Sequence, residues 1–188
     1  MRTDDDQIGT QIYENVIAHT NCASYEYKRA NFFNNNVIYD VDPDGMLAFS
    51  IRWGEPDLGT FEKNIFVDVF GESYTYLNYD ELGDAYTMSI DFNMYYRYSG
   101  SRRHDKQPHH TWKVWVGPED ISFDADLRLL RSLGQDTNSS YDVDPMFVDA
   151  DNDDFRLRAE SPARDMGIRS IDISKTGPQH DPDSVMSV

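Results

Sequence analysis

The sequence contains a single cysteine, Cys22, among 188 residues. One thiol excludes an internal disulfide, and its simplest role is that of a small core side chain. No apolar run approaches the roughly 20 residues that a membrane-spanning helix needs. The residues after Met1 read Arg-Thr-Asp-Asp-Asp, which lacks the basic start and apolar stretch of a signal peptide. The sequence therefore predicts neither membrane insertion nor a leader within this chain.

Basic residues are also scarce, because 17 lysines and arginines face 34 aspartates and glutamates, a net charge of −17. Phosphate recognition needs clustered lysine and arginine, so the charge excludes nucleic acids and anionic membranes as expected partners. The chain also lacks a nucleophile motif, a phosphate-binding glycine loop and a Cys/His metal pattern. Aromatic residues make up 13%, too many for a disordered acidic chain, so we expect one domain with a sizeable core.

What is present is a weak repeat of an asparagine followed by two apolar or aromatic residues. It begins at Asn15, Asn36, Asn64 and Asn93, with spacings of 21, 28 and 29 residues. Repeats of this period indicate a solenoid. In such a stack the asparagines of successive turns bond to one another's amides, and the following apolar residues stack inside. The alternative is chance, because asparagine is abundant in this chain.

Strand candidates lie between these asparagines, separated by turn signals rich in proline, glycine and aspartate. They cover Met46 to Arg52, Phe61 to Val69 and Thr87 to Phe92, and we expect 70–86 and 99–120 to be projecting loops. One short α-helix is predicted near 122–133. Its leucines form an apolar stripe, Asp124 and Asp126 precede Arg128 and Arg131 as the helix dipole favours, and Gly134 is a natural stop.

The segment from Asp144 to Gly167 has the most specific local pattern. Asp144-Pro145 enforces an extended entry to an apolar strand at 146–148, and an acidic turn follows. Residues 155–158 then alternate apolar and basic, as in a strand with one wet face. Ser161-Pro162 is an N-cap with proline at the first helical position. Strand, acidic turn, strand and one-turn helix are expected to close the end of a stack of strands.

This segment, with Gly134 to Ser139 upstream and Ile171 to Gly177 downstream, resembles the closing stretch of pectate-lyase-like right-handed parallel β-helix proteins. The resemblance covers about 120–178 well and 30–100 as loose rungs. It implies an all-β, right-handed parallel β-helix over 1–177, with a closing segment at 120–177 and a disordered tail at 178–188. It also implies a secreted, extracellular or periplasmic full-length protein, a glycoside hydrolase or polysaccharide lyase that acts on a polysaccharide or oligosaccharide.

Residue 13 onward already has the pattern of a rung, so we expect the fold to be incomplete at its N-terminal side. Catalytic residues would then lie in upstream coils, and the exposed end would pair with those coils or with another chain. Two alternatives to an enzyme are open. One is a non-catalytic β-helix that binds glycan or caps a longer solenoid, and the other is a calcium-stabilised surface or adhesion module.

Calcium is suggested by Asp40, Asp42 and Asp44, which form the D-x-D-x-D-G start of a calcium-binding loop. The acidic residue expected at the twelfth position is replaced by Ile51, and Pro43 stiffens the loop. A solvated turn between two strands is the alternative.

The catalytic candidates are Arg52, Glu55, Asp57 and Asp91, with Trp53 as a platform for sugar. A carboxylate pair beside an aromatic residue suits glycoside hydrolysis, and an arginine near calcium-bound uronate suits a lyase. Asp91 is included because it lies within a predicted strand. The alternatives are structural: an acidic turn at 54–57 with a packed Trp53, and a polar outer strand face around Asp91.

Overall fold

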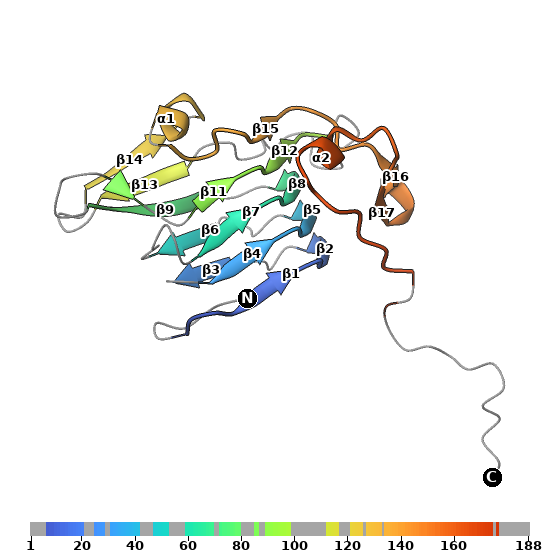
Figure 1. The fold of residues 1–188 in the computed structure, drawn as a ribbon, viewed down its shortest axis with the longest axis horizontal. Coiled ribbons are helices and arrows are strands. Elements are labelled where there is room, and N and C mark those ends of the chain that lie inside the picture. Colours follow the sequence, from blue (N-terminus) through green and yellow to red (C-terminus); the bar gives the residue numbers. More distant parts are fainter. Residues whose placement is uncertain are drawn as a thin grey trace, which may run out of the picture.

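The structure is a computed structural model (Figure 1), and it describes residues 7–20, 25–28, 31–41, 47–52, 59–69, 72–79, 85–86, 89–98, 112–116, 121–125, 127–132, 134–174 and 176. The described chain passes four times through three sheets in the same order, and each of these passes places one strand in each sheet, before β14 and β15 extend two of the sheets. The N-terminal predictions for residues 1–6 and the predicted tail at 178–188 lie outside the described residues.

Parallel pairing dominates all three sheets. Sheet 1 contains β1 (Gln11–Tyr13), β4 (Phe32–Asn34), β7 (Thr60–Glu62) and β11 (Ser89–Asp91). Sheet 2 contains β2 (Val16–Thr20), β5 (Val37–Val41), β8 (Ile65–Val69), β12 (Met94–Tyr96) and β15 (Ser140–Tyr141). Sheet 3 contains β3 (Tyr25–Lys28), β6 (Leu47–Arg52), β9 (Glu72–Tyr79), β13 (Trp112–Val116) and β14 (Ile121–Ala125). The predicted all-β class and parallel stacking are confirmed, and the architecture is consistent with a β-helix or solenoid.

Among the strands that the structure describes, three pairs are antiparallel: β9 with β10 (Ala85–Tyr86), β13 with β14, and a C-terminal pair. The expectation of projecting loops at 70–86 and 99–120 is therefore wrong for β9, β10 and β13. These stretches are rich in tyrosine, threonine, valine and tryptophan, residue types that favour a pleated surface. They supply the third strand of their turns.

The predicted helix is present but shorter, because α1 spans only Leu127–Ser132. Residues 121–125 belong to β14 instead, since Ile121, Phe123 and Ala125 alternate with polar residues at the period of a strand. The predicted stop is confirmed: Gly134 has φ +76°, and its N–H donates to the Arg131 carbonyl at 3.0 Å.

Aromatic side chains fill the interior in stacked columns. Phe33 and Phe61 of sheet 1 have ring centroids 5.2 Å apart, and Phe61 lies 5.6 Å from Phe66 of sheet 2. The column continues through Tyr95 at 5.2 Å and Tyr141 at 4.6 Å. Phe33 and Phe61, Phe66 and Tyr95, and Tyr95 and Tyr141 are register partners on neighbouring strands. The contact between Phe61 and Phe66 lies within one turn and joins sheet 1 to sheet 2.

The predicted asparagine ladder is confirmed. The backbone N–H of Asn15 donates to Asn36 Oδ1 at 3.1 Å, and that of Asn36 donates to Asn64 Oδ1 at 3.0 Å. The N–H of Asn64 donates to Asn93 Oδ1 at 3.0 Å, and that of Asn93 to Ser139 Oγ at 2.9 Å. Side-chain amides repeat the first three links at 3.0 to 3.1 Å. Asn36, Asn64 and Asn93 are fully buried, so the ladder satisfies polar groups that water does not reach.

The residue before each ladder asparagine has a left-handed backbone. These residues are Glu14, Asn35, Lys63 and Phe92, with φ of 55 to 58°. For residues with a Cβ this conformation costs roughly 1–2 kcal/mol. The cost is offset by the ladder, because the bend turns the chain from sheet 1 into sheet 2 and directs the asparagine inward.

Truncation of Asn64 tests this account. Asn64→Ala leaves the buried N–H of Asn36 and the Phe33 carbonyl without their partners. At roughly 1–3 kcal/mol for each unsatisfied group, we expect a loss of about 3 kcal/mol in the free energy of unfolding. Asn15→Ala, at the exposed end of the ladder, is the control and should cost less than about 1 kcal/mol. Urea denaturation measures both, and equal losses would contradict a ladder that stabilises through burial.

The local structure predicted for the C-terminal segment is confirmed. It forms β16 (Phe147–Asp149), the 3-10 turn η1 (Ala150–Asn152), β17 (Asp154–Leu157) and α2 (Pro162–Asp165). Ser161 caps α2, because its Oγ accepts the N–H of Ala163 at 3.2 Å. Gly167 then ends it with φ +77°.

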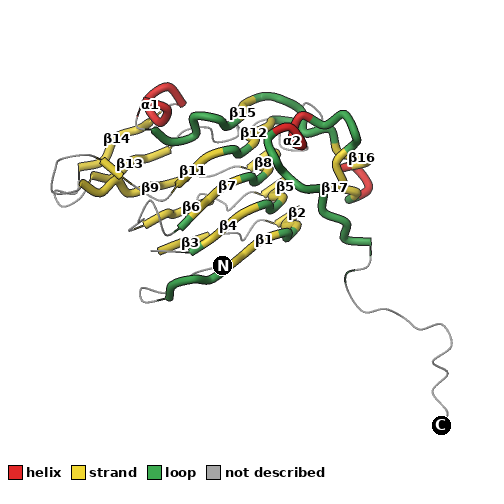
Figure 2. The backbone as a smooth tube through the Cα atoms, viewed as in Figure 1, coloured by secondary structure: helices red, strands yellow, loops and turns green. Residues whose placement is uncertain are grey.

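The position of this segment differs from the expectation. We call residues 144–173 the strap, because they pack along the side of the stack and not across its end (Figures 1 and 2). The strap residues Phe147, Phe155 and Leu157 share a buried cluster with Val37 and Val67 of sheet 2. Beyond the last turn of sheet 1 lies residue 136 instead, whose N–H donates to the Ile90 carbonyl at 2.6 Å. Local signals define the strap's elements but not the surface that it covers.

Candidate functional site

The outer face of sheet 1 is open and polar. In each strand the middle residue points inward, and Phe33, Phe61 and Ile90 are 0 to 2% exposed. The flanking residues share the opposite face because strand side chains alternate. They are Gln11 and Tyr13, Phe32 and Asn34, Thr60 and Glu62, and Ser89 and Asp91, all exposed or half-buried. This face therefore carries amide, hydroxyl, carboxylate and aromatic groups.

Hydrogen bonds fix the side chains along this face. Asn34 Nδ2 lies 2.6 Å from Thr60 Oγ1, and Asn34 Oδ1 accepts the N–H of Glu62 at 2.9 Å. Ser89 Oγ donates to Glu62 Oε1 at 2.5 Å. The polar groups are therefore held in place before any ligand arrives, which lowers the entropy that binding would cost.

At the N-terminal end of the face a pocket of about 320 Å³ opens between the first two turns. It is lined by Gln11, Ile12, Tyr13, Phe32, Asn34 and Arg169. Tyr13 is 53% exposed, so most of its ring is available. We call this hollow the sheet 1 pocket.

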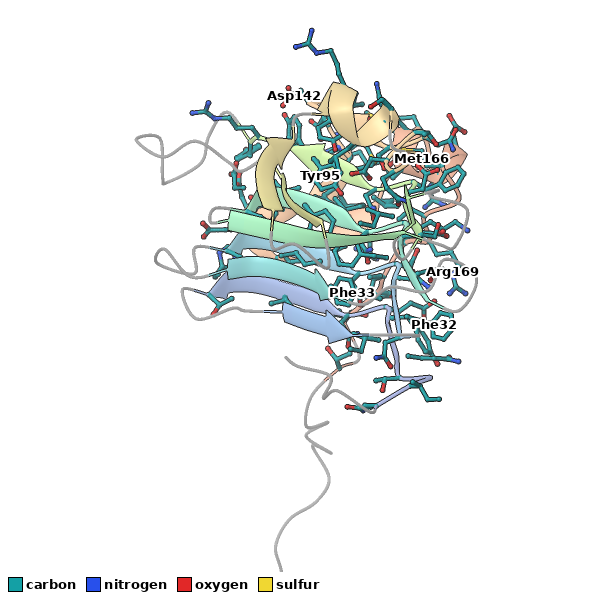
Figure 3. All side chains as sticks on the ribbon, turned by 90° about the vertical axis from the view of Figure 1, so that its left-hand side faces the viewer. Phe32, Phe33, Tyr95, Asp142, Met166 and Arg169 are labelled. Carbon is teal, nitrogen blue, oxygen red and sulfur yellow. The ribbon has the colours of Figure 1, made fainter. Side chains whose placement is uncertain are left out.

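Arg169 reaches the sheet 1 pocket from the strap, as Figure 3 shows beside Phe32. Its backbone is held by Asn35, whose Oδ1 accepts the Arg169 N–H at 2.6 Å and whose Nδ2 donates to the Arg169 carbonyl at 3.2 Å. The guanidinium pairs with Glu14 at 2.6 Å. Two segments 134 residues apart thus build one wall of the pocket.

Asp91 is the one catalytic candidate whose side chain the structure describes. Its Oδ1 accepts the N–H groups of Phe92 and Asn138 at 2.9 and 2.7 Å. Its Oδ2 accepts Thr137 Oγ1 and Asn138 Nδ2 at 3.1 and 2.7 Å. Four donors occupy the carboxylate, so in this arrangement Asp91 anchors the turn at 137–138 to sheet 1.

The other candidates are placed only in part. Arg52 is the last residue of β6, and its side chain lies outside the described part of the structure, as do Trp53, Glu55 and Asp57. Their proposed constellation stays a prediction.

Asp40 is the described member of the predicted calcium loop, since Asp42 and Asp44 lie outside the described residues. Its Oδ2 lies 2.9 Å from His19 Nδ1, and His19 Nε2 lies 2.8 Å from Asp153 of the strap. The hydrogen bond to Asp40 raises the pKa of His19, against partial desolvation. Within the described ranges no group of three or more His, Cys, Asp or Glu residues is placed to hold a metal ion. The calcium loop stays a prediction.

Asp136 is the buried carboxyl group of the Gly134 to Ser139 motif. It accepts Ser139 Oγ at 2.6 Å and the hydroxyls of Tyr95 and Tyr141 at 3.3 and 3.2 Å. Burial raises its pKa to about 6, although the hydrogen bonds from Ser139 and Tyr141 oppose the shift. The same burial raises the pKa of Tyr95 well above its usual value. Asp136 thus terminates the ladder, because Ser139 connects it to Asn93.

The raised pKa of Asp136 gives the protein a pH dependence. The folded state binds the proton of Asp136 more tightly than the unfolded chain does. The contribution of Asp136 to the free energy of unfolding is therefore largest below pH 3.8 and is lost as the pH rises through about 6. The difference between these two pKa values corresponds to about 3 kcal/mol. When the pH rises from 4 to 7, we expect the free energy of unfolding of wild type to fall by roughly this amount relative to that of Asp136→Asn. Urea denaturation across that range measures it.

The exposed Asp165→Asn is the matched control for this experiment and should keep the wild-type pH profile. Parallel profiles for wild type and Asp136→Asn would contradict the assignment of a protonatable, buried Asp136.

Four residues of the sheet 1 pocket were not expected from the sequence: Tyr13, Phe32, Asn34 and Arg169. The sequence does hold a signal for the first three. The inward residue of each sheet 1 strand lies three positions before a ladder asparagine, and Tyr13, Phe32 and Asn34 are direct neighbours of such inward residues. Arg169 has no local signal, since only the path of the strap brings it to this pocket.

The comparisons with known proteins give no family. No family model matches the chain, and neither the curated proteins nor the solved structures include a match. Among the described residues no helix has the length and apolar character needed to cross a membrane. The geometry of the molecule is therefore the guide to its function.

Proposed function

We propose that this chain is a glycan-binding β-solenoid whose ligand lies on the outer face of sheet 1. The observation that carries the proposal is the sheet 1 pocket, in which two aromatic rings, two amides and a guanidinium converge. Aromatic side chains pack against the apolar C–H face of a sugar ring. Amides and guanidinium groups bond to its hydroxyls, because they offer several donors or acceptors in one plane.

The shape of sheet 1 suits a linear polymer that runs along the stack. Neighbouring strands lie about 4.8 Å apart, so Tyr13, Asn34, Glu62 and Asp91 present one side chain per turn along one line. A chain of sugars laid across the strands would meet Tyr13 and Phe32 first and the hydrogen-bonded polar groups afterwards.

Charge favours a neutral glycan. The carboxylates Glu62 and Asp91 lie on the face, Arg169 is already paired with Glu14, and the whole chain carries −17. A uronate polymer would be repelled by this field. In this proposal the solenoid is right-handed, belongs to the pectate-lyase-like group that its C-terminal half resembles, and works outside the cell.

Binding is preferred to hydrolysis for the described part of the chain. Glu62 and Asp91 are register partners on adjacent strands, as a carboxylate pair would require. However, Asp91 accepts four hydrogen bonds from the folded chain, and Glu62 accepts one from Ser89. A general acid must instead be free to approach the glycosidic oxygen.

Substitution of the aromatic residues tests the proposal. Wild type is screened against neutral plant and algal polysaccharides by affinity electrophoresis, and the best ligand is titrated by calorimetry. Loss of a ring contact worth about 1 kcal/mol predicts a fivefold to tenfold weaker affinity for Tyr13→Ala and for Phe32→Ala. Tyr98→Ala removes a half-exposed aromatic residue outside this face and should bind as wild type does.

Two outcomes would count against binding as the function of this face. One is an affinity that all three alanine variants lower equally. The other is release of reducing ends from the polysaccharide by wild type and not by Glu62→Gln, which would restore the enzyme interpretation.

A further inference from the structure

A second pocket, separate from the sheet 1 pocket, lies between the outer face of sheet 2 and the strap. Its volume is about 230 Å³. The sheet side provides Tyr39, Val67 and Tyr96, with Tyr98 just beyond β12. The other wall is the strap, through residues 144–151 and Arg158. We call this hollow the strap pocket, and neither glycan binding nor the ladder requires it.

The strap pocket is preformed by packing on both sides. Tyr39 lies 5.0 Å from Phe155 and 6.4 Å from Phe147, measured between ring centroids, and the two phenylalanines are 5.5 Å apart. On the strap, Asp144 Oδ1 accepts the N–H of Met146 at 2.7 Å. The walls therefore keep their positions without a ligand.

Acidic groups outnumber basic ones around this pocket. Asp144, Asp149 and Asp151 line it, and the basic lining residue is Arg158, whose Nη2 donates to the Val148 carbonyl at 3.0 Å. Behind the tyrosines lies Asp68, which is 2% exposed and whose Oδ1 accepts the N–H of Tyr98 at 3.0 Å.

The tyrosines respond to this negative field. Burial raises the pKa of Tyr39 to about 12, and the charges of Asp151 and Asp68 act in the same direction. Burial likewise raises the pKa of Tyr96, with Asp144 and Asp68 adding to it. Both phenols therefore remain neutral, and the carboxylates of Asp68, Asp144 and Asp151 are charges that act on them.

We propose that the strap pocket binds a small organic cation, an alkylammonium group with an apolar body. Tyr96 and Tyr98 are half-buried and line the pocket, so the part of each ring that faces it can make a cation–π contact. The aspartates supply the opposite charge at the rim, and Val67 and Phe147 give the alkyl part an apolar floor. A bare metal ion fits less well, because the described residues offer no group of three ligands.

Choline is the probe, and its neutral isostere 3,3-dimethylbutan-1-ol is the matched ligand control. Calorimetry on the full chain should detect choline and show at least tenfold weaker binding of the isostere. A contact of this kind predicts a roughly fivefold to tenfold loss of choline affinity for Tyr98→Ala. Tyr98→Phe keeps the ring and should bind within about twofold of wild type.

Charge and location have their own controls. Asp151→Asn should weaken choline binding about threefold, as expected for a partly exposed charge pair. Asp165→Asn removes an exposed carboxylate of the strap that does not line the pocket, and Tyr13→Ala alters the sheet 1 pocket. Both should leave choline affinity unchanged. Far-ultraviolet circular dichroism and the urea midpoint confirm that each variant is folded.

Three results would overturn the proposal: equal affinity for choline and its isostere, equal loss in Asp151→Asn and Asp165→Asn, or displacement of choline by calcium at lower concentration than by butylammonium. None of these results depends on glycan binding, since the glycan proposal is tested with other variants, Tyr13→Ala and Phe32→Ala, and with another ligand. Failure of one proposal is therefore distinguishable from failure of the other.

Discussion

The hydrogen-bonded column that runs from Asn15 through Asn36, Asn64 and Asn93 to Ser139 is the constraint on which the rest of the structure depends. A parallel sheet alone would tolerate slippage between turns, because backbone groups are the same at every residue. The buried asparagine side chains do not allow such a shift in register, since it would leave several hydrogen-bond donors and acceptors without partners. The column therefore fixes the register of sheets 1 and 2 together.

Both candidate sites follow from that register. On sheet 1 it places one polar or aromatic side chain per turn along a line, which is the geometry that an extended ligand needs. On sheet 2 it aligns Val37, Val67 and their neighbours into an apolar outer surface that the strap covers. The strap then contributes to both sites, because it carries Arg169 to one pocket and Asp144 and Asp151 to the other. One packed segment thus connects two surfaces of the stack.

Sequence reasoning succeeded where the signal was local or repeated. The ladder was predictable because asparagine recurs before apolar pairs, and α2 because Ser161 and Gly167 mark its ends. It failed for β9 and β13, whose stretches resembled long insertions, and for the start of α1, where Asp124 resembled a first-turn acid. The path of the strap could not be predicted either, since the strap packs on residues of sheet 2 that are distant in the sequence. The site residues Tyr13 and Arg169 meet only after that packing.

Each turn consists of a fixed part, which forms its strands in sheets 1 and 2, and a part of variable length, which leads through sheet 3. This division determines where the chain can change. Residues 11–20, 32–41 and 60–69 each form a short strand, a two-residue corner and a longer strand, and these strands pair in register from turn to turn. The stretches between them differ in length and lead through sheet 3. We therefore expect insertions and deletions in these stretches to be tolerated better than in the fixed parts, which makes them suitable places for grafted peptides. A single residue gained inside a fixed part would displace every turn that follows.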